Sequence, residues 1–141
     1  MGSDLTALVE RLPGRNGPAA VEAIAAAERA VGSLPEDYKM FLRLVNGFEG
    51  SINDAWYLRL YRAEELAEMN AGYTVSQTRT GLVLFGTDGG GEGFCFDLKR
   101  NGPPVLMVNF IGDWREDALA CGNGFSDFMS KVFAGWSPLQ R

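Results

Sequence analysis

The sequence contains no histidine and only two cysteines, and both shortages narrow the chemistry that this chain can perform. Histidine is the commonest general base and the commonest metal ligand in proteins, so serine–histidine and cysteine–histidine nucleophile pairs are excluded. Cys95 and Cys121 match neither a metal-ligand spacing nor a CxxC redox pair. We therefore expect two free thiols in a reducing compartment, with no bound metal and no cofactor.

Long apolar runs and clusters of basic residues are also missing. No apolar run approaches the ~20 residues that span a bilayer, and the N-terminus lacks the pattern of a signal peptide, so we expect a cytoplasmic protein without membrane contact. The sequence has 18 Asp and Glu residues but only 13 Lys and Arg residues, which gives a net charge of −5. Nucleic acid is not an expected partner, because phosphates demand clustered Lys and Arg. A basic protein is the better electrostatic match.

The length of 141 residues predicts one domain, residues 1–141. Apolar residues at helical spacing predict helices, whereas alternating or short apolar runs predict strands. Within the best-marked helix, Pro35 suits the first turn and Asn46-Gly47 supplies a stop. The order predicts an α+β fold with a mainly antiparallel sheet. The expected helices are 18–31, 34–47, 63–70 and 125–133, and the expected strands are 55–63, 81–86, 92–98 and 104–110.

The stretch 86–97, GTDGGGEGFCFD, places five glycines in eight residues. A phosphate-binding P-loop needs a lysine at its seventh position and a helix after it. This chain has Glu92 at that position and an alternating strand after it. The stretch therefore predicts a turn between two core strands, whose glycines permit positive φ. The alternative left open is a weak cation or partner contact through Asp88 and Glu92.

Two motifs together resemble the Smi-one/Knr-four type of the SUKH superfamily over roughly residues 20–134. The first is LPEDYKMFLRLVNG (34–47), and the second is GLVLFGTDGGGEGFCFDL (81–98), while the closing FSDFMSKVF (125–133) resembles the last helix of that family. The resemblance implies a curved sheet flanked by N-terminal helices and a C-terminal helix, with no catalytic centre. Bacterial members are mostly immunity proteins that neutralise toxins, often nucleases, and fungal members are regulatory scaffolds.

Three groups of residues are candidates for contact with a partner protein. Asp113, Trp114, Glu116 and Asp117 combine an aromatic ring with acids, which suits a basic partner, although for Trp114 anchoring of the core is the favoured interpretation. The strand 55–63 carries Trp56 on one face and Tyr57, Arg59 and Tyr61 on the other, of which one face must be core. The third group is the glycine-rich turn with Asp88 and Glu92.

Three classes of function follow from these observations. The leading hypothesis is a non-catalytic immunity protein, monomeric or weakly dimeric, that binds a basic toxin domain. The alternative is a regulatory or scaffolding adaptor without a toxin partner. An enzyme is the least favoured class, because Asp88 and Glu92 are the only carboxylate pair in a glycine loop and such a turn holds catalytic groups poorly.

Overall fold

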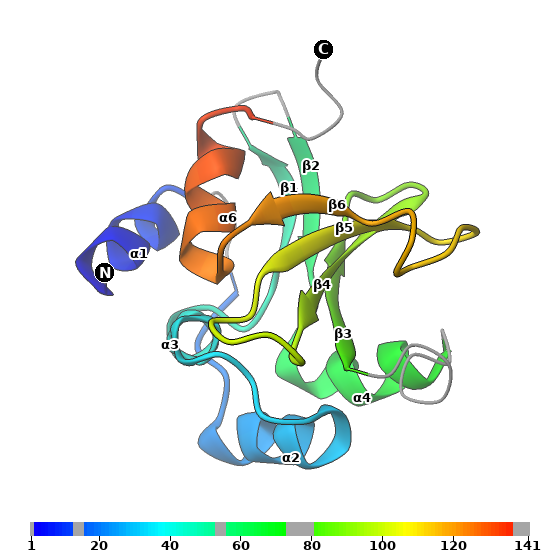
Figure 1. Ribbon diagram of the computed structural model, residues 1–141. Coiled ribbons are helices and arrows are strands. Elements are labelled where there is room, and N and C mark those ends of the chain that lie inside the picture. The colour runs from blue at the N-terminus through cyan, green and yellow to red at the C-terminus, as the bar shows by residue number, and fades with distance from the viewer. Residues whose placement is uncertain (1, 13–15, 53–55, 73–80, 137–141) are drawn as a thin grey trace.

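The computed structural model describes residues 2–12, 16–52, 56–72 and 81–136, with the side chains of residues 2–4 and 56 left out. Within these residues the chain forms helices and one antiparallel sheet, which confirms the predicted α+β fold (Figure 1). The helices are α1 (Gly2–Glu10), α2 (Val21–Val31), α3 (Glu36–Leu44), α4 (Ala63–Gly72) and α6 (Phe125–Phe133). The strands are β1 (Phe48–Ile52), β2 (Trp56–Leu60), β3 (Leu82–Thr87), β4 (Glu92–Asp97), β5 (Val105–Asn109) and β6 (Leu119–Gly122).

The sheet is a meander in which each strand pairs with the next one along the chain, in the order β1-β2-β3-β4-β5-β6. All five pairings are antiparallel, and the sheet is open and strongly twisted (Figure 1). The β2–β3 pairing is short, since only Arg59↔Thr87 and Leu60↔Gly86 are in register. The first half of β3 is therefore left without a neighbouring strand on the β2 side.

The core lies between the sheet and helices α3 and α6. Tyr38 of α3 packs against Phe85, Phe96 and Phe125, with ring centroids 5.0–5.5 Å apart. Phe128 of α6 lies 4.9 Å from the Phe94 ring. These contacts confirm the apolar stripes predicted for both helices, since an amphipathic helix buries its apolar stripe against a sheet.

The core extends further towards the N-terminus than the sequence pattern indicates. Leu5 and Val9 of α1 and the following Leu12 are buried, and α1 contacts both α3 and α6. The edge strands β1 and β6 were not predicted, because their sequences FEGSI and LACG contain small residues of low strand propensity. Pairing with β2 and β5 makes these segments strands.

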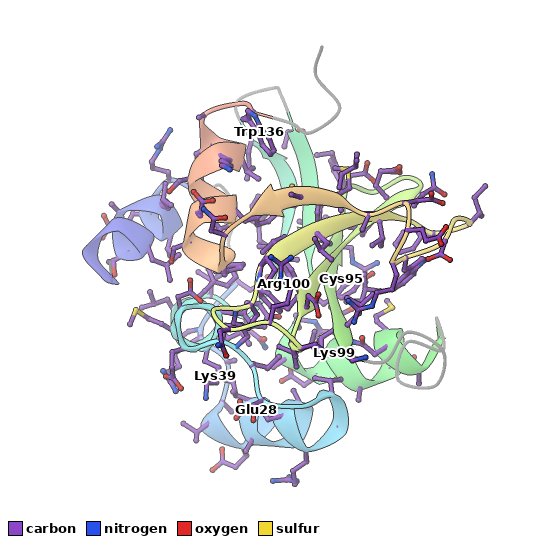
Figure 2. All side chains as sticks on the ribbon, in the orientation of Figure 1. Glu28, Lys39, Cys95, Lys99, Arg100 and Trp136 are labelled. Atoms are coloured by element: carbon purple, nitrogen blue, oxygen red, sulfur yellow. The ribbon has the colours of Figure 1, made fainter. Side chains whose placement is uncertain are left out.

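Helices α2 and α3 are joined by polar contacts as well as by packing. Lys39 Nζ lies 3.2 Å from Glu28 Oε2, and the two side chains face each other between the helices (Figure 2). The same Glu28 carboxylate accepts a 2.9 Å hydrogen bond from Leu34 N–H, in the connection between the helices. Helix α3 itself begins later than predicted, at Glu36, with Pro35 as its N-cap.

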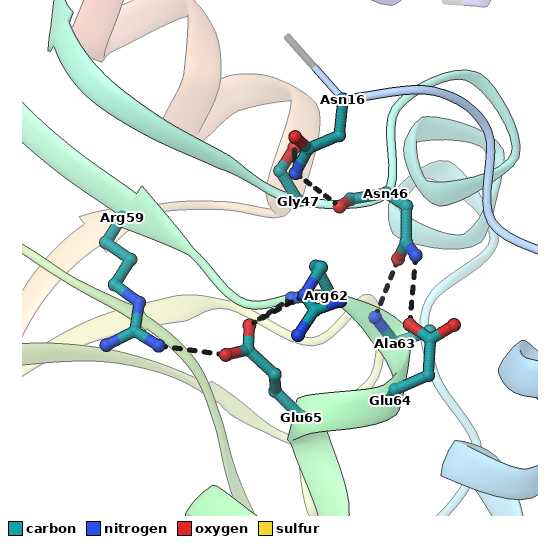
Figure 3. A network of polar contacts seen from close by, with 8 residues as sticks. All are labelled: Asn16, Asn46, Gly47, Arg59, Arg62, Ala63, Glu64 and Glu65. Atoms are coloured by element: carbon teal, nitrogen blue, oxygen red, sulfur yellow. Dashed lines mark hydrogen bonds and ion pairs between the residues drawn. The ribbon is translucent and has the colours of Figure 1, made fainter.

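Asn46-Gly47 does more than stop α3. The helix ends at Leu44, and the Asn46 side chain accepts a hydrogen bond from Ala63 N–H (2.8 Å) and donates one to Glu64 (2.9 Å), both at the start of α4 (Figure 3). Gly47 has φ of +83°, and a Cβ there would lie 2.8 Å from the Leu60 carbonyl oxygen. The pair therefore ties the end of α3 to the end of β2 and to α4.

Helix α4 occupies the part of β3 that β2 leaves open. Its buried Asn70 accepts a hydrogen bond from Leu84 N–H (2.8 Å) and donates one to Leu84 C=O (3.0 Å). One side-chain amide thus replaces the donor and acceptor of a missing strand, which satisfies backbone groups that would be costly to bury alone. The helix predicted at 63–70 extends two residues further, to Gly72.

No helix among the described residues is both long enough and apolar enough to cross a membrane.

Candidate protein-binding surface

A groove of about 710 Å³ lies on the face of β1, β2 and β3 that points away from α3 and α6. Cross-strand partners in an antiparallel sheet share a face, so Glu49, Arg59 and Thr87 stand in one row across these strands. The groove is lined by Glu49, Tyr57, Arg59, Tyr61, Met69, Phe110 and the turn residues 87–90.

The polar floor of the groove comes from β1 and β2. The Tyr57 hydroxyl donates a hydrogen bond to the Glu49 carboxylate, and this bond raises the pKa of Tyr57 above its ordinary value. Tyr57 therefore stays neutral, and its side chain remains 43% exposed. The Arg59 guanidinium lies 2.9 Å from Glu65 Oε2 of α4 and 5.2 Å from the centre of the Tyr61 ring. Figure 3 shows Arg59 turned towards Glu65.

The glycine-rich stretch forms the rim of the groove and is the predicted β3–β4 hairpin turn. Asp88 Oδ1 accepts hydrogen bonds from Gly90 N–H (2.9 Å) and Glu92 N–H (3.2 Å), which closes the turn. Gly89 has φ of +83°, and a Cβ there would lie 2.6 Å from the Tyr57 ring. The glycine is needed both for this backbone conformation and for the approach of the turn to the ring.

The β5–β6 loop (residues 110–118) continues from the groove wall at the same end of the sheet (Figure 1). Phe110 N–H donates to the Gly91 carbonyl (2.9 Å), and Arg115 forms a 2.9 Å ion pair with the buried Asp97 of β4. Asp113 Oδ1 accepts from Arg115 N–H (2.8 Å) and Glu116 N–H (2.9 Å). The loop is thus held in one shape from within and fastened to the sheet.

Trp114 does not contribute an exposed ring to this loop. Its side chain is only 2% exposed and packs beside Phe110, with ring centroids 5.9 Å apart. The prediction of Trp114 as a partner contact is therefore wrong, and the core-anchoring alternative holds. The exposed apolar residue of the loop is Ile111, which is 97% exposed and which the sequence analysis did not single out.

The sequence profile of the SMI1/KNR4 family (SUKH-1) matches residues 18–131, which is most of the chain. The chain belongs to the SMI1/KNR4 family. The resemblance seen in the two sequence motifs is confirmed. No curated protein matches the chain significantly. SUKH-1 proteins are generally non-catalytic and associate with protein partners.

In this SUKH-1 domain the motif positions carry the fold and not the exposed surface. Tyr38, Phe41 and Leu42 of the first motif and Phe85, Phe94 and Phe96 of the second are fully buried. The partner surface must therefore be sought among residues outside the apolar motif positions.

The structure brings together some of the predicted contact residues and separates others. Tyr57, Arg59 and Asp88 line the groove. Glu92 lies beside it, where its carboxylate accepts a hydrogen bond from Asn109 (3.2 Å). Asp113, Glu116 and Asp117 lie on the β5–β6 loop, where Glu116 is exposed. Trp56 begins β2, but its side chain lies outside the described part of the structure.

Two other residues of the groove lining are Tyr61 and Glu49. Tyr61, which shares a face of its strand with Tyr57 and Arg59, is 2% exposed and forms the floor of the groove beneath Arg59. Glu49 was missed, because its strand β1 was missed. Gly50 and Ser51 weaken the alternation of β1, which explains that omission.

The described residues offer little catalytic chemistry. Burial raises the pKa of Cys121 to about 12, so this thiol stays protonated at neutral pH, and Cys95 is buried as well. Nowhere in the described ranges do three or more Cys, Asp or Glu residues gather in a way that could hold a metal ion. Glu92 and Asp88 are both engaged in the hydrogen bonds of the turn region.

Proposed function

We propose that this SUKH-1 domain is an immunity-type protein that binds and neutralises a bacterial toxin domain with a basic surface, acting in the cytoplasm. The observation that carries the proposal is the family match over residues 18–131. The net charge of −5 supports a basic partner, because complementary charge speeds encounter and selects the partner. A toxin that acts on nucleic acid needs a positive cleft, and an acidic inhibitor complements such a cleft.

The groove and the β5–β6 loop form the surface that we assign to this contact. The loop presents the exposed Ile111, followed by the acids Asp113, Glu116 and Asp117. An apolar anchor with acidic neighbours fits an interface in which a few residues carry most of the binding energy. Because Trp114 and the Arg115–Asp97 ion pair already hold the loop, little ordering cost remains on binding.

Neutralisation in this proposal is steric and electrostatic. A rigid acidic surface covers the active cleft of the toxin and repels its anionic substrate, and the inhibitor itself performs no reaction. Rigid preformed surfaces move little when they bind, so the free structure is a fair guide to the bound one.

The test is calorimetric titration of this protein with the product of the gene immediately upstream, prepared as an inactivated toxin domain. We expect one-to-one binding that weakens as salt rises, and a loss of affinity in Glu116→Lys. Glu116 is preferred over Asp117 for this substitution, because Asp117 also holds the loop by accepting a hydrogen bond from Asp113 N–H (3.1 Å). The matched control is Glu22→Lys on α2, an exposed charge reversal outside the assigned surface.

Absence of binding at micromolar concentration would contradict the toxin partner. It would favour the regulatory adaptor, whose partner would then be sought by pull-down from the native cell. If Glu116→Lys and Glu22→Lys lowered the affinity equally, the toxin partner would stand but the assigned surface would be rejected, because only the net charge would then matter.

A further inference from the structure

Two carboxylates of the groove form no ion pair with any of the described residues. Glu49 is exposed and Asp88 is partly exposed, and neither forms an ion pair with any residue of the described ranges. Glu49 lies directly opposite Arg59 across the β1–β2 ladder, which is where an ion pair would be expected. The Arg59 guanidinium instead pairs with Glu65 at 2.9 Å and covers the Tyr61 ring.

The groove therefore has a negative balance although it contains an arginine. Its lining carries the two carboxylates Glu49 and Asp88 against the single guanidinium of Arg59, which already pairs with Glu65 of α4. The exposed Tyr57 ring and the Phe110 ring lie among these charges and present aromatic surface. Carboxylates beside aromatic rings are the surroundings that a cationic side chain favours, through ion pairing and cation–π attraction.

Size and rigidity also suit an inserted side chain. The volume of about 710 Å³ lies within the ~300–1,000 Å³ common for ligand sites. Both carboxylates are already oriented, Glu49 by the Tyr57 hydroxyl and Asp88 by two backbone N–H groups of the turn. A planar guanidinium can stack on an aromatic ring while its donors reach carboxylates, which an ammonium cannot do equally well.

We propose that the groove is the receptor for an arginine side chain of the protein partner, held between the Tyr57 ring and the carboxylates of Glu49 and Asp88. The proposal rests on the proposed function, because it names the chemistry by which that partner is recognised. The arginine would bind where it forms two ion pairs and covers the ring, so that the acidic groove distinguishes a basic partner from a neutral one.

The test is an NMR titration of the intact ¹⁵N-labelled protein with the capped tripeptide acetyl-Gly-Arg-Gly-amide. We expect saturable shifts centred on the amides of Tyr57, Arg59, Gly89 and Gly90. The same peptide with citrulline, which has the shape of arginine without its charge, should leave these amides in place. Shifts scattered over the surface, or equal shifts with citrulline, would overturn the proposal.

Two isosteric variants test the carboxylates without removing their structural hydrogen bonds. Asp88→Asn can still accept from the turn N–H groups, and Glu49→Gln can still accept from Tyr57. Each should weaken the arginine peptide about threefold to fivefold, as expected for losing one exposed ion pair. The control Glu22→Gln should bind as the parent does. Unchanged binding in both groove variants would reject the assignment.

An acidic peptide tests the alternative that the groove binds anions. If acetyl-Gly-Glu-Gly-amide produced the groove shifts through Arg59, the groove would be a receptor for anions and the proposal would be wrong. Failure here is distinguishable from failure of the proposed function. A toxin domain that binds the parent, Asp88→Asn and Glu49→Gln equally would overturn the arginine receptor and leave neutralisation standing.

Discussion

Replacing Asn70 by alanine tests whether one side-chain amide holds α4 on the sheet. The Asn70 amide bonds both backbone groups of Leu84 and also donates to the Leu66 carbonyl (2.8 Å). Alanine keeps the helix, because it is the best helix former, but it leaves Leu84 N–H and C=O without these partners. Leu84 is fully buried, so water does not reach these groups without local opening.

The expected loss is large for a single exchange. Each buried backbone group left unsatisfied costs about 1–3 kcal/mol, so the two groups of Leu84 together predict a loss of roughly 2–6 kcal/mol in the free energy of unfolding. A domain of this size has about 5–15 kcal/mol in total. A loss of about 3 kcal/mol would lower the Tm by roughly 10 °C.

Urea denaturation followed by far-UV circular dichroism measures this loss, and hydrogen exchange of the Leu84 amide locates it. We expect that amide to exchange much faster in Asn70→Ala, while amides at the β4–β5 pairing are slowed as in the parent. A loss below about 1 kcal/mol with Leu84 still protected would refute the reasoning, because the amide would then not be the partner that satisfies β3.

Asn70→Asp is the matched variant, because it keeps an acceptor for Leu84 N–H but loses the donor to Leu84 C=O. Burial and the facing carbonyl disfavour the carboxylate, so the pKa of the new Asp should be raised in the folded state. The folded state then binds more protons than the unfolded state, and stability rises as pH falls towards the unfolded pKa of about 3.9. The difference in unfolding free energy between Asn70→Asp and the parent should therefore shrink between pH 7 and pH 5. A difference that does not change with pH would show that the residue faces water.

Three further substitutions test the core and the turn. Phe128→Ala should lower the free energy of unfolding by about 3–5 kcal/mol in urea denaturation, because the ring is fully buried. An unchanged urea midpoint would show that the Phe128 face of α6 does not pack in the core. Tyr38→Phe should raise the unfolding free energy by about 1 kcal/mol, since the buried hydroxyl has no hydrogen-bond partner within the described residues; a loss of stability would reveal one. Gly89→Ala should lower the Tm through a cost of about 1–2 kcal/mol, because its φ is positive and the Tyr57 ring is in the way, whereas Gly91→Ala, with no atom within 4 Å, is the tolerated control. Equal Tm values for the two glycine variants would contradict the turn geometry.

Much of the fold follows from local patterns. The apolar stripes of α3 and α6 predict two packed helices, and the alternation around β4 predicts a strand, because a helix or strand must bury its apolar face. Glu92 at the lysine position of the glycine stretch excludes a phosphate loop on local sequence alone. Charge balance and the missing histidine depend only on composition.

The contact surface was less predictable. Trp114 and Ile111 lie in one loop, and only the tryptophan was a candidate contact from the sequence, yet Trp114 is buried and Ile111 is exposed. The direction of each side chain depends on how the loop crosses the end of the sheet, which the ion pair of Arg115 with Asp97 helps to set from 18 residues away. No local periodicity contains that information.

The sequence by itself determined the secondary structure with strong periodicity, the acidic character and the exclusion of histidine chemistry, because these depend on neighbouring residues or on simple sums. Only the tertiary structure decided that Glu49, Arg59 and Asp88 share one groove, that β1 is a strand, and that Asn70 completes β3. Each of these features depends on pairing between different segments of the chain, where burial and hydrogen bonding override weak local preference.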